Sequence, residues 1–418
     1  MNKKSTVAQH EKEMCRDQEQ PIPMGVWGIG IVQFLINTST VMVFGIAAVY
    51  LKAILSVSIF WISLLEGTVE CLAYVMRIVS GALSDYLRKR KALMLFGYGL
   101  MTLARPIFAI SNSFALVFSA RIIDRLGNGV QATPRDALVG DLAPESRKGA
   151  CFGLRQTLGT AGSFFGGILG ITSMILTNND FQMVFWIASA PAVIAVILLM
   201  VLVKDPDNSK EDAHNKELVE RQKLKWQDIS KLGTGFWVLM SVVAVFMLAR
   251  LSEAFLILHA HTNFALPKEY TPIVLILYNA TYSLSSYPIG KLSDRLGRPT
   301  LLAIGIAVLA ITDLMLSFAP NLFVVLLGVA TWGVQMGISQ SMFLSMVADH
   351  VPERLRGTGF GMFYLISGVS LFGASLCAGK IAESFDEAAA YFASFVVATT
   401  SLVLLLFVRK KLLTITRN

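Results

Sequence analysis

Residues 81–91 read GALSDYLRKRK, and residues 290–300 read GKLSDRLGRPT. The two stretches share Gly, Leu, Ser, Asp and Leu in register, at an offset of 209 residues. A second pair, LVGDLAPESRKGACFG from Leu138 and MVADHVPERLRGTGFG from Met346, matches at an offset of 208. Two independent matches at nearly the same offset indicate that one structural unit occurs twice in the chain.

Most of this repeated unit is apolar. Of the 418 residues, 54% are hydrophobic and 15% are charged, and the mean hydropathy is +0.61. Soluble proteins carry roughly 25% charged residues. The apolar residues fall in blocks of roughly 20, the length at which a helix crosses about 30 Å of hydrocarbon. Since lipid offers the backbone no hydrogen-bond partners, the blocks are predicted to be membrane-spanning helices.

Twelve such helices are predicted, six in each copy of the repeat. They cover residues 24–50, 57–80, 92–111, 114–134, 150–176, 181–203, 233–258, 270–289, 299–318, 321–346, 357–380 and 387–408. The expected fold is all-α, with six-helix bundles at 24–203 and 233–408 and a charged linker at 204–232. Residues 1–23 and 409–418 are expected to be tails, the first without the features of a signal peptide.

The loops between these spans differ in basic residues. The loops at 88–91 and 147–148 are basic, whereas SNS at 111–113, TNND at 177–180 and APN at 319–321 contain no Lys or Arg. The positive-inside rule therefore predicts that both termini are cytoplasmic, in a plasma membrane or bacterial inner membrane. Topology explains the net charge of +8, which gives no support for nucleic-acid binding.

The repeated loop resembles the signature of the major facilitator superfamily between spans two and three, roughly Gly-x-Leu-Ala/Ser-Asp-Arg-x-Gly-Arg-Arg/Lys. Residues 290–298 match it well, whereas Arg88 stands where the family has its second glycine. The resemblance implies a cytoplasmic latch that holds the two halves together in one state. Its residues here are Gly81, Asp85, Arg88, Gly290, Asp294, Arg295 and Arg298. The alternative is that these charges only fix the topology and solvate a loop.

Two other stretches resemble family patterns. Arg125 followed by Gly129 resembles the fourth-span Arg-x-x-Gln-Gly, with Asn in place of Gln. The glycines at 162, 166 and 167 resemble the fifth-span antiporter signature, although Ser163 replaces its proline. A glycine-rich face is equally consistent with close helix packing.

Several ionisable residues fall within the predicted spans, where they are costly unless they face a cavity or one another. Glu66 and Glu70 share one helix face and are expected to line the route between the halves, with arginines of other helices or protons as partners. The candidates for proton coupling are Glu66, Glu70, Asp124 and Glu253. The candidates for substrate binding or a charge network are Arg77, Arg121, Arg125 and Arg250. Inert buried ion pairs are the alternative.

Sequence spacing suggests partners for some of these groups. Asp124 lies within one helical turn of Arg121 and Arg125 and is expected to serve either of them. Arg250 and Glu253, three residues apart, are expected either to pair within one helix or to face the central cavity.

Other ionisable residues have no obvious partner in the sequence. Arg105 and Asp313 are expected to be cavity or packing charges. His259 and His261 are two residues apart and therefore on different helix faces, so a surface or interface role is expected instead of a metal pair. The four cysteines form no metal-ligand cluster in the sequence.

The predicted function is secondary transport of a small organic solute by proton-coupled alternating access between two bundles. The arginines at membrane depth favour an anionic or zwitterionic substrate. The alternatives are a proton-driven drug or metabolite efflux antiporter and a siderophore or nutrient permease, with a channel or a non-transporting receptor less favoured. No Walker-type sequence occurs, so ATP drive is not expected. The linker at 204–232 is too short for a soluble catalytic domain, so an enzyme is not expected either, and no cofactor is expected. The expected partners are the solute, protons and the lipid bilayer, with the chain acting as a monomer.

Overall fold

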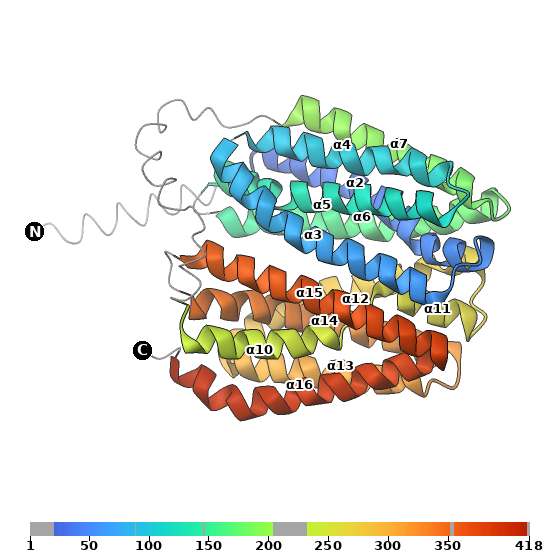
Figure 1. Ribbon diagram of the computed structural model, residues 1–418. Helices are drawn as coiled ribbons and strands as arrows, with labels where there is room; N and C mark the ends of the chain where they lie inside the picture. Colours follow the sequence, from blue (N-terminus) through green and yellow to red (C-terminus); the bar gives the residue numbers. More distant parts are fainter. Residues whose placement is uncertain (1–20, 88, 145–146, 204–231, 352–354, 416–418) are drawn as a thin grey trace, which may run out of the picture.

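The computed structural model in Figure 1 consists of helices that lie side by side in two groups, one above the other. It describes residues 21–87, 89–144, 147–203, 232–351 and 355–415, and no strand occurs among these residues. The first group contains α2 (Met24–Val49) with its π-helical extension η1 (Tyr50–Ile54), α3 (Ile59–Leu87), α4 (Arg90–Ala109), α5 (Phe114–Leu142), α6 (Lys148–Leu176) and α7 (Phe181–Leu202).

The second group begins after the linker. It contains α10 (Thr234–Leu248), α11 (Glu253–Thr262), the short η3 (Lys268–Tyr270), α12 (Pro272–Leu296), α13 (Arg298–Ser317), α14 (Leu322–His350), α15 (Arg356–Ser384) and α16 (Glu387–Ile415). With α10 and α11 counted as one span, the described helices form two sets of six, so the predicted all-α fold is confirmed. Helix α2 begins and α16 ends at the same end of the bundle, here called the terminal end (Figure 1).

The short loops at the opposite end of the bundle supply helix caps. Ser113 accepts a hydrogen bond from the Leu116 amide at the start of α5, and Asp180 accepts one from the Met183 amide at the start of α7. Asn321 does the same for α14. Each cap satisfies one of the amides that a helix leaves unpaired in its first turn. Each of the three loops without Lys or Arg therefore ends in a residue that caps the helix after it.

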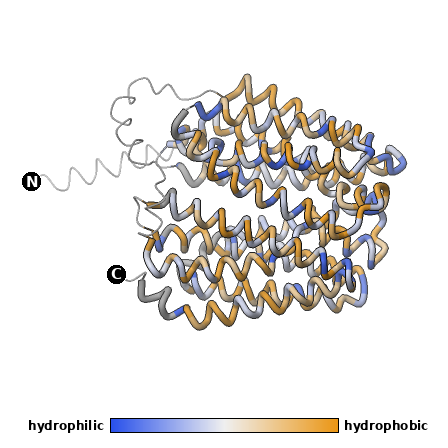
Figure 2. Tube along the Cα trace, viewed as in Figure 1, coloured by the Kyte–Doolittle hydropathy of each residue, from blue (hydrophilic) through white to orange (hydrophobic). Residues whose placement is uncertain are grey.

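Ten stretches of the described chain are long and apolar enough to cross a membrane. Helices α5 and α12 are not among them, although both lie within the bundle (Figure 1). Charged residues such as Arg121 and Asp124 lower the hydropathy of α5. Figure 2 shows hydrophobic residues along the length of the helices, with hydrophilic residues concentrated near their ends.

The two groups meet along α3 with α15 and along α6 with α12. Glycines allow the first contact, because a Cβ atom at Gly67 would lie 2.6 Å from the Ser375 Cβ. Within the first group, Gly162 and Gly166 lie directly against the backbone of α2. This part of the antiporter-like glycine pattern therefore serves close helix packing.

The seventh span is broken, which differs from the continuous helix predicted over 233–258. Helix α10 ends at Leu248 and α11 starts at Glu253, with Ala249–Ser252 as a non-helical connection. Ser252 caps α11 by accepting a hydrogen bond from the Ala254 amide at 3.2 Å. The hydroxyl of Ser394 on α16 hydrogen-bonds to the carbonyl of Ala249. Tertiary contacts and a local cap thus stabilise the break.

Candidate functional site

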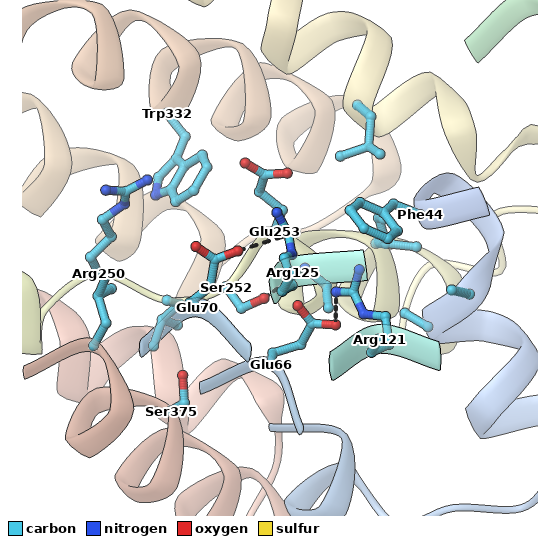
Figure 3. Close-up of a pocket in the computed structure, with 17 residues that line it drawn as sticks. Phe44, Glu66, Glu70, Arg121, Arg125, Arg250, Ser252, Glu253, Trp332 and Ser375 are labelled. Carbon is cyan, nitrogen blue, oxygen red and sulfur yellow. Dashed lines mark hydrogen bonds and ion pairs between the residues drawn. The ribbon is translucent and has the colours of Figure 1, made fainter. Parts of the chain in front are cut away.

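A pocket lies between the two groups of helices. It is lined from α2, α3 and α5 on one side, and from the break in span seven, α12, α14 and α15 on the other. Six charged residues line it, namely Glu66, Glu70, Arg121, Arg125, Arg250 and Glu253 (Figure 3). The structure therefore gathers six of the eight predicted charged candidates at one site, whereas Arg77 and Asp124 do not line it.

Two ion pairs connect α3 and α5 in this pocket. Glu66 pairs with Arg121, and Glu70 Oε1 lies 3.1 Å from Arg125 Nη2 (Figure 3). The acids and the arginines are each four residues apart, so one helical turn separates the two pairs on both helices. The first pair is deeply buried, whereas the Glu70 side chain remains 33% exposed and the Arg125 side chain 17% exposed. A solute in the pocket therefore reaches the second pair more readily.

Phe44 of α2 lies against both arginines. Its ring centre is 3.8 Å from the guanidinium carbon of Arg121 and 4.6 Å from that of Arg125. Such cation–π contacts hold a guanidinium group in place without using its N–H donors. Arg121 Nη1 and Arg125 Nε have no hydrogen-bond partner among the described residues. Both nitrogen atoms are buried, so the contact with Phe44 is part of what holds the two guanidinium groups in place.

The wall contributed by the second group is built around the broken span. Arg250 lies in the break and Glu253 in the first turn of α11, so they do not share a continuous helix. No ion pair involving either side chain is present in the described part of the structure. In Figure 3, Arg250 lies on the same side as Trp332, while Glu253 lies near Arg125. Of the two sequence-based alternatives, the structure shows the one in which both face the cavity.

Asp124 has a different partner from the one predicted. Its carboxylate lies 3.0 Å from Arg105 Nη1 of α4, and both side chains are almost fully buried. Arg105 also donates hydrogen bonds to Ser39 and Thr40 of α2, each at 2.9 Å. The expectation that Asp124 serves Arg121 or Arg125 was wrong, because its face of α5 is turned toward α4. Asp124 and Arg105 join three helices within the first group.

Of the surface and interface roles expected for the histidines, the structure shows an interface between helices for His259. His259 is buried, with Nε2 at 3.1 Å from the Leu316 carbonyl and Nδ1 at 3.1 Å from the Asn263 amide. It therefore holds α11 against α13 and is not a surface residue. His261 is partly buried, and its Nδ1 lies 2.7 Å from the Leu266 carbonyl.

A second polar cluster lies in the first group, toward the terminal end from the pocket. Asp136 on α5 lies 2.9 Å from Arg135 and 3.1 Å from Arg155 of α6. Arg135 also donates to Gln33 of α2 at 2.7 Å. Sequence analysis missed this cluster because the predicted fourth span stops at 134, which placed the two α5 charges in a loop. The sequence Pro134-Arg135-Asp136 was the signal that could have indicated it.

Arg77 stands apart, with its guanidinium carbon 5.2 Å from the Tyr74 ring centre.

Two matching ion pairs occupy the terminal end. Arg90 at the start of α4 pairs with Asp141 of α5, and Arg298 at the start of α13 pairs with Asp349 of α14. Both residues of the second pair are offset by 208 from those of the first, so the pairs follow the internal repeat. Of the other predicted latch residues, Gly81 packs near Thr133 of α5. Arg88 and the side chains at positions 85, 290, 294 and 295 lie outside the described residues.

The chain is similar in sequence to proteins of a known family. A family model described as Major Facilitator Superfamily matches residues 29–271 and 238–414. The chain belongs to the major facilitator superfamily. An uncharacterised MFS-type transporter of Methanocaldococcus jannaschii is 27% identical over 409 residues, covering 96% of this chain and 99% of that protein. Membership makes the chain a multi-pass membrane transporter and not an enzyme.

More distant members of the superfamily with named activities are also similar. Quinolone resistance protein NorA of Staphylococcus aureus is 26% identical over 184 residues, covering 44% of this chain and 46% of NorA. A crystal structure of a mutant nucleoside transporter NupG superposes with a TM-score of 0.76 at 13% identity, covering 93% of this chain and 99% of that one. A crystal structure of a POT family transporter in complex with 5-aminolevulinic acid superposes with a TM-score of 0.76 at 12% identity, covering 93% of this chain and 97% of that one. At such identities the two structures show the shared fold alone.

Proposed function

We propose that the chain transports a small organic anion or zwitterion by proton-coupled alternating access of its two bundles. The observation that carries the proposal is Arg250, a cation that lines the pocket and makes no ion pair among the described residues. Arginine stays charged at all physiological pH values, and its planar fork suits a carboxylate or phosphate group. A bound anion would give Arg250 the partner that it lacks.

The remaining pocket groups suit the rest of such a solute. Arg121 and Arg125 line the pocket from the first group and supply positive charge, and Glu70 and Glu253 supply acceptors for an ammonium group. Trp332 and Leu371 supply apolar surface. Glu253 makes no ion pair among the described residues, which makes it a candidate for binding the coupling proton. Proton binding at Glu253 would then alter its competition with the substrate for Arg125 and Arg250.

The same proposal covers orientation and assembly. The positive-inside rule and the basic loops favour a terminal end in the cytoplasm of a plasma or bacterial inner membrane. Residues 24–203 and 233–408 form the two moving bundles, the linker at 204–232 and the tails at 1–23 and 409–418 are cytoplasmic, and the chain works as a monomer. A rigid-body rocking of the bundles would expose the pocket to each side in turn.

A matched ligand panel tests the substrate class. Purified protein is heated with carboxylates, with their amides or methyl esters, and with the corresponding amino acids, and the unfolding temperature is recorded. We expect stabilisation by members that carry a carboxylate and none by the neutral partners. Arg250→Gln should abolish that stabilisation, whereas the exposed control Lys380→Gln should retain it. Any hit is then taken to proteoliposomes with an imposed pH gradient.

Efflux of an amphiphilic compound is the second candidate function. The similarity to NorA over 184 residues and the apolar lining by Phe44, Trp332 and Leu371 favour it. The same thermal panel, extended to lipophilic amines, separates the two candidates. Stabilisation by amines alone, unaffected by Arg250→Gln, would replace the anion proposal with this one.

A further inference from the structure

A short chain of hydrogen bonds links α13 and α16 to the break in span seven. Ser394 Oγ lies 2.6 Å from Asp313 Oδ2 and also hydrogen-bonds to the carbonyl of Ala249. Asp313 is 1% exposed, Ser394 4% and Ala249 0%, so water does not compete for these bonds. Ala249 directly precedes Arg250, which lines the pocket and makes no ion pair among the described residues. The chain therefore runs from a buried acid to the backbone that carries Arg250.

The hydroxyl of Ser394 has only one proton to donate. If Asp313 is ionised, its carboxylate and the Ala249 carbonyl both need that proton, and one buried acceptor is left unsatisfied. If Asp313 is protonated, it donates to Ser394 Oγ, and Ser394 donates to Ala249. All three groups are then satisfied. Because α10 stops at this point, the Ala249 carbonyl is one of those that a helix end leaves without an intrahelical partner.

The surroundings of Asp313 also disfavour its charge. Tyr391 of α16 interacts electrostatically with Asp313 and with Glu387, and His259 of α11 lies beside the Tyr391 ring. Both ring nitrogens of His259 are already engaged. Helix α10 contains no ionisable residue, and the charged residues of α12 and α14 lie at their terminal ends. No cation therefore offsets an ionised Asp313 among the described residues, and an unpaired buried carboxylate is strongly unfavourable.

We infer that Asp313 is a proton-binding site outside the pocket, and that its bound proton holds the break in span seven and so positions Arg250. Loss of the proton turns the Ser394 hydroxyl toward the carboxylate and releases the Ala249 carbonyl. The end of α10 is then less restrained, and the position of Arg250, the next residue along the chain, is less well fixed. Asp313 acts on the pocket through Ser394 and the backbone, as a positioning residue. The inference does not depend on which solute the pocket binds or on proton coupling at Glu253.

Infrared difference spectroscopy on the purified full-length protein tests the protonation directly. Wild type at neutral pH should show a band of a hydrogen-bonded protonated carboxyl group that Asp313→Asn lacks. Asn donates like the protonated acid, so this variant should fold normally. Glu383→Gln is the control, because Glu383 is a partly exposed carboxylate beside Lys380, and this variant should keep the band. An unchanged band in Asp313→Asn would overturn the inference.

Hydrogen exchange across residues 245–256 tests the positioning role. In wild type, exchange corrected for its intrinsic rate should become roughly tenfold faster as pH rises and Asp313 loses its proton, the effect of about one hydrogen bond. Asp313→Asn should keep the slow exchange at every pH, and Ser394→Ala should show fast exchange at every pH. If Asp313→Asn fails to fold, Ser394→Ala tests the inference in its place. Removal of the Ser394 hydroxyl should shift the infrared band of the protonated Asp313 carboxyl group. Identical pH dependence in all three proteins would contradict the mechanism.

Discussion

Glu70 of α3 and Arg125 of α5 form an ion pair at 3.1 Å, one helical turn from the deeper pair of Glu66 and Arg121. The two helices run in the same direction, so equal spacing of acids and arginines aligns the pairs. The deeper pair is closed off, whereas the outer pair faces the pocket. A solute or a proton that enters the pocket therefore acts first on Glu70 and Arg125.

Replacing Arg125 by Lys tests this accessible pair. Lysine keeps the charge but loses the planar fork that contacts Glu70 and Phe44. We expect substrate affinity to fall about tenfold, which corresponds to about 1.4 kcal/mol, with little change in the unfolding temperature. Binding is measured by titration, with Lys380→Arg as the control. Wild-type affinity in Arg125→Lys would show that positive charge alone suffices at this position.

Replacing Glu253 by Gln tests proton coupling. Glutamine keeps the size of the side chain but fixes a neutral form. Exchange of substrate at zero gradient should persist, because it needs no net proton movement, whereas accumulation driven by a pH gradient should be lost. Glu70→Gln is compared under the same conditions. If Glu253→Gln still concentrates substrate as wild type does, the proton site must lie at Glu70 or Glu66.

The pair of Arg105 and Asp124 is expected to be structural. Asp124→Asn leaves Arg105 buried without its counter-charge and should destabilise the protein by about 3–5 kcal/mol. The double variant Arg105→Met with Asp124→Leu should recover much of that loss. Thermal unfolding in detergent measures both. A stable Asp124→Asn protein without transport would instead assign Asp124 a functional role.

Gly45 is expected to control closure at the end opposite the termini. The Thr271 hydroxyl donates to the Gly45 carbonyl at 2.8 Å, and a Cβ at Gly45 would lie 2.9 Å from the Pro272 Cβ. Gly45→Val should therefore push the two bundles apart there and favour the state open at that end. Labelling of a cysteine placed at Ile257 should increase several-fold. Gly99→Val, where a Cβ meets nothing within 4 Å, is the control and should leave labelling unchanged.

The repeated terminal-end pairs provide a test of the latch. Arg90→Gln and Arg298→Gln break partly exposed pairs, which contribute roughly 0–1 kcal/mol to stability. We expect an almost unchanged unfolding temperature but slower transport, because the states interconvert less readily. Asp85→Asn and Asp294→Asn should behave alike. Normal transport rates in all four variants would show that these charges only fix the topology and do not form a latch.

The sequence by itself determined the span count and the duplication of this chain. An apolar block of about 20 residues is a local property, and lipid leaves the backbone few alternatives to a helix. It also indicated that Glu66 and Glu70 share a face, since that depends only on helical period. Even so, the predicted end of span four at 134 was too early. Polar residues that face protein rather than lipid do not mark the end of a membrane helix.

Only the tertiary structure decided which charges meet and where span seven breaks. Asp124 lies within one turn of two arginines along the chain, yet the rotation of α5 turns it toward Arg105 of α4. The segment from Leu248 to Glu253 contains neither Pro nor Gly, and its one local signal is Ser252, which can cap a helix but does not by itself end the preceding one. Ser394, some 145 residues away, satisfies the carbonyl that the break exposes. Helix rotation and long-range hydrogen bonds depend on neighbours that the local sequence does not specify.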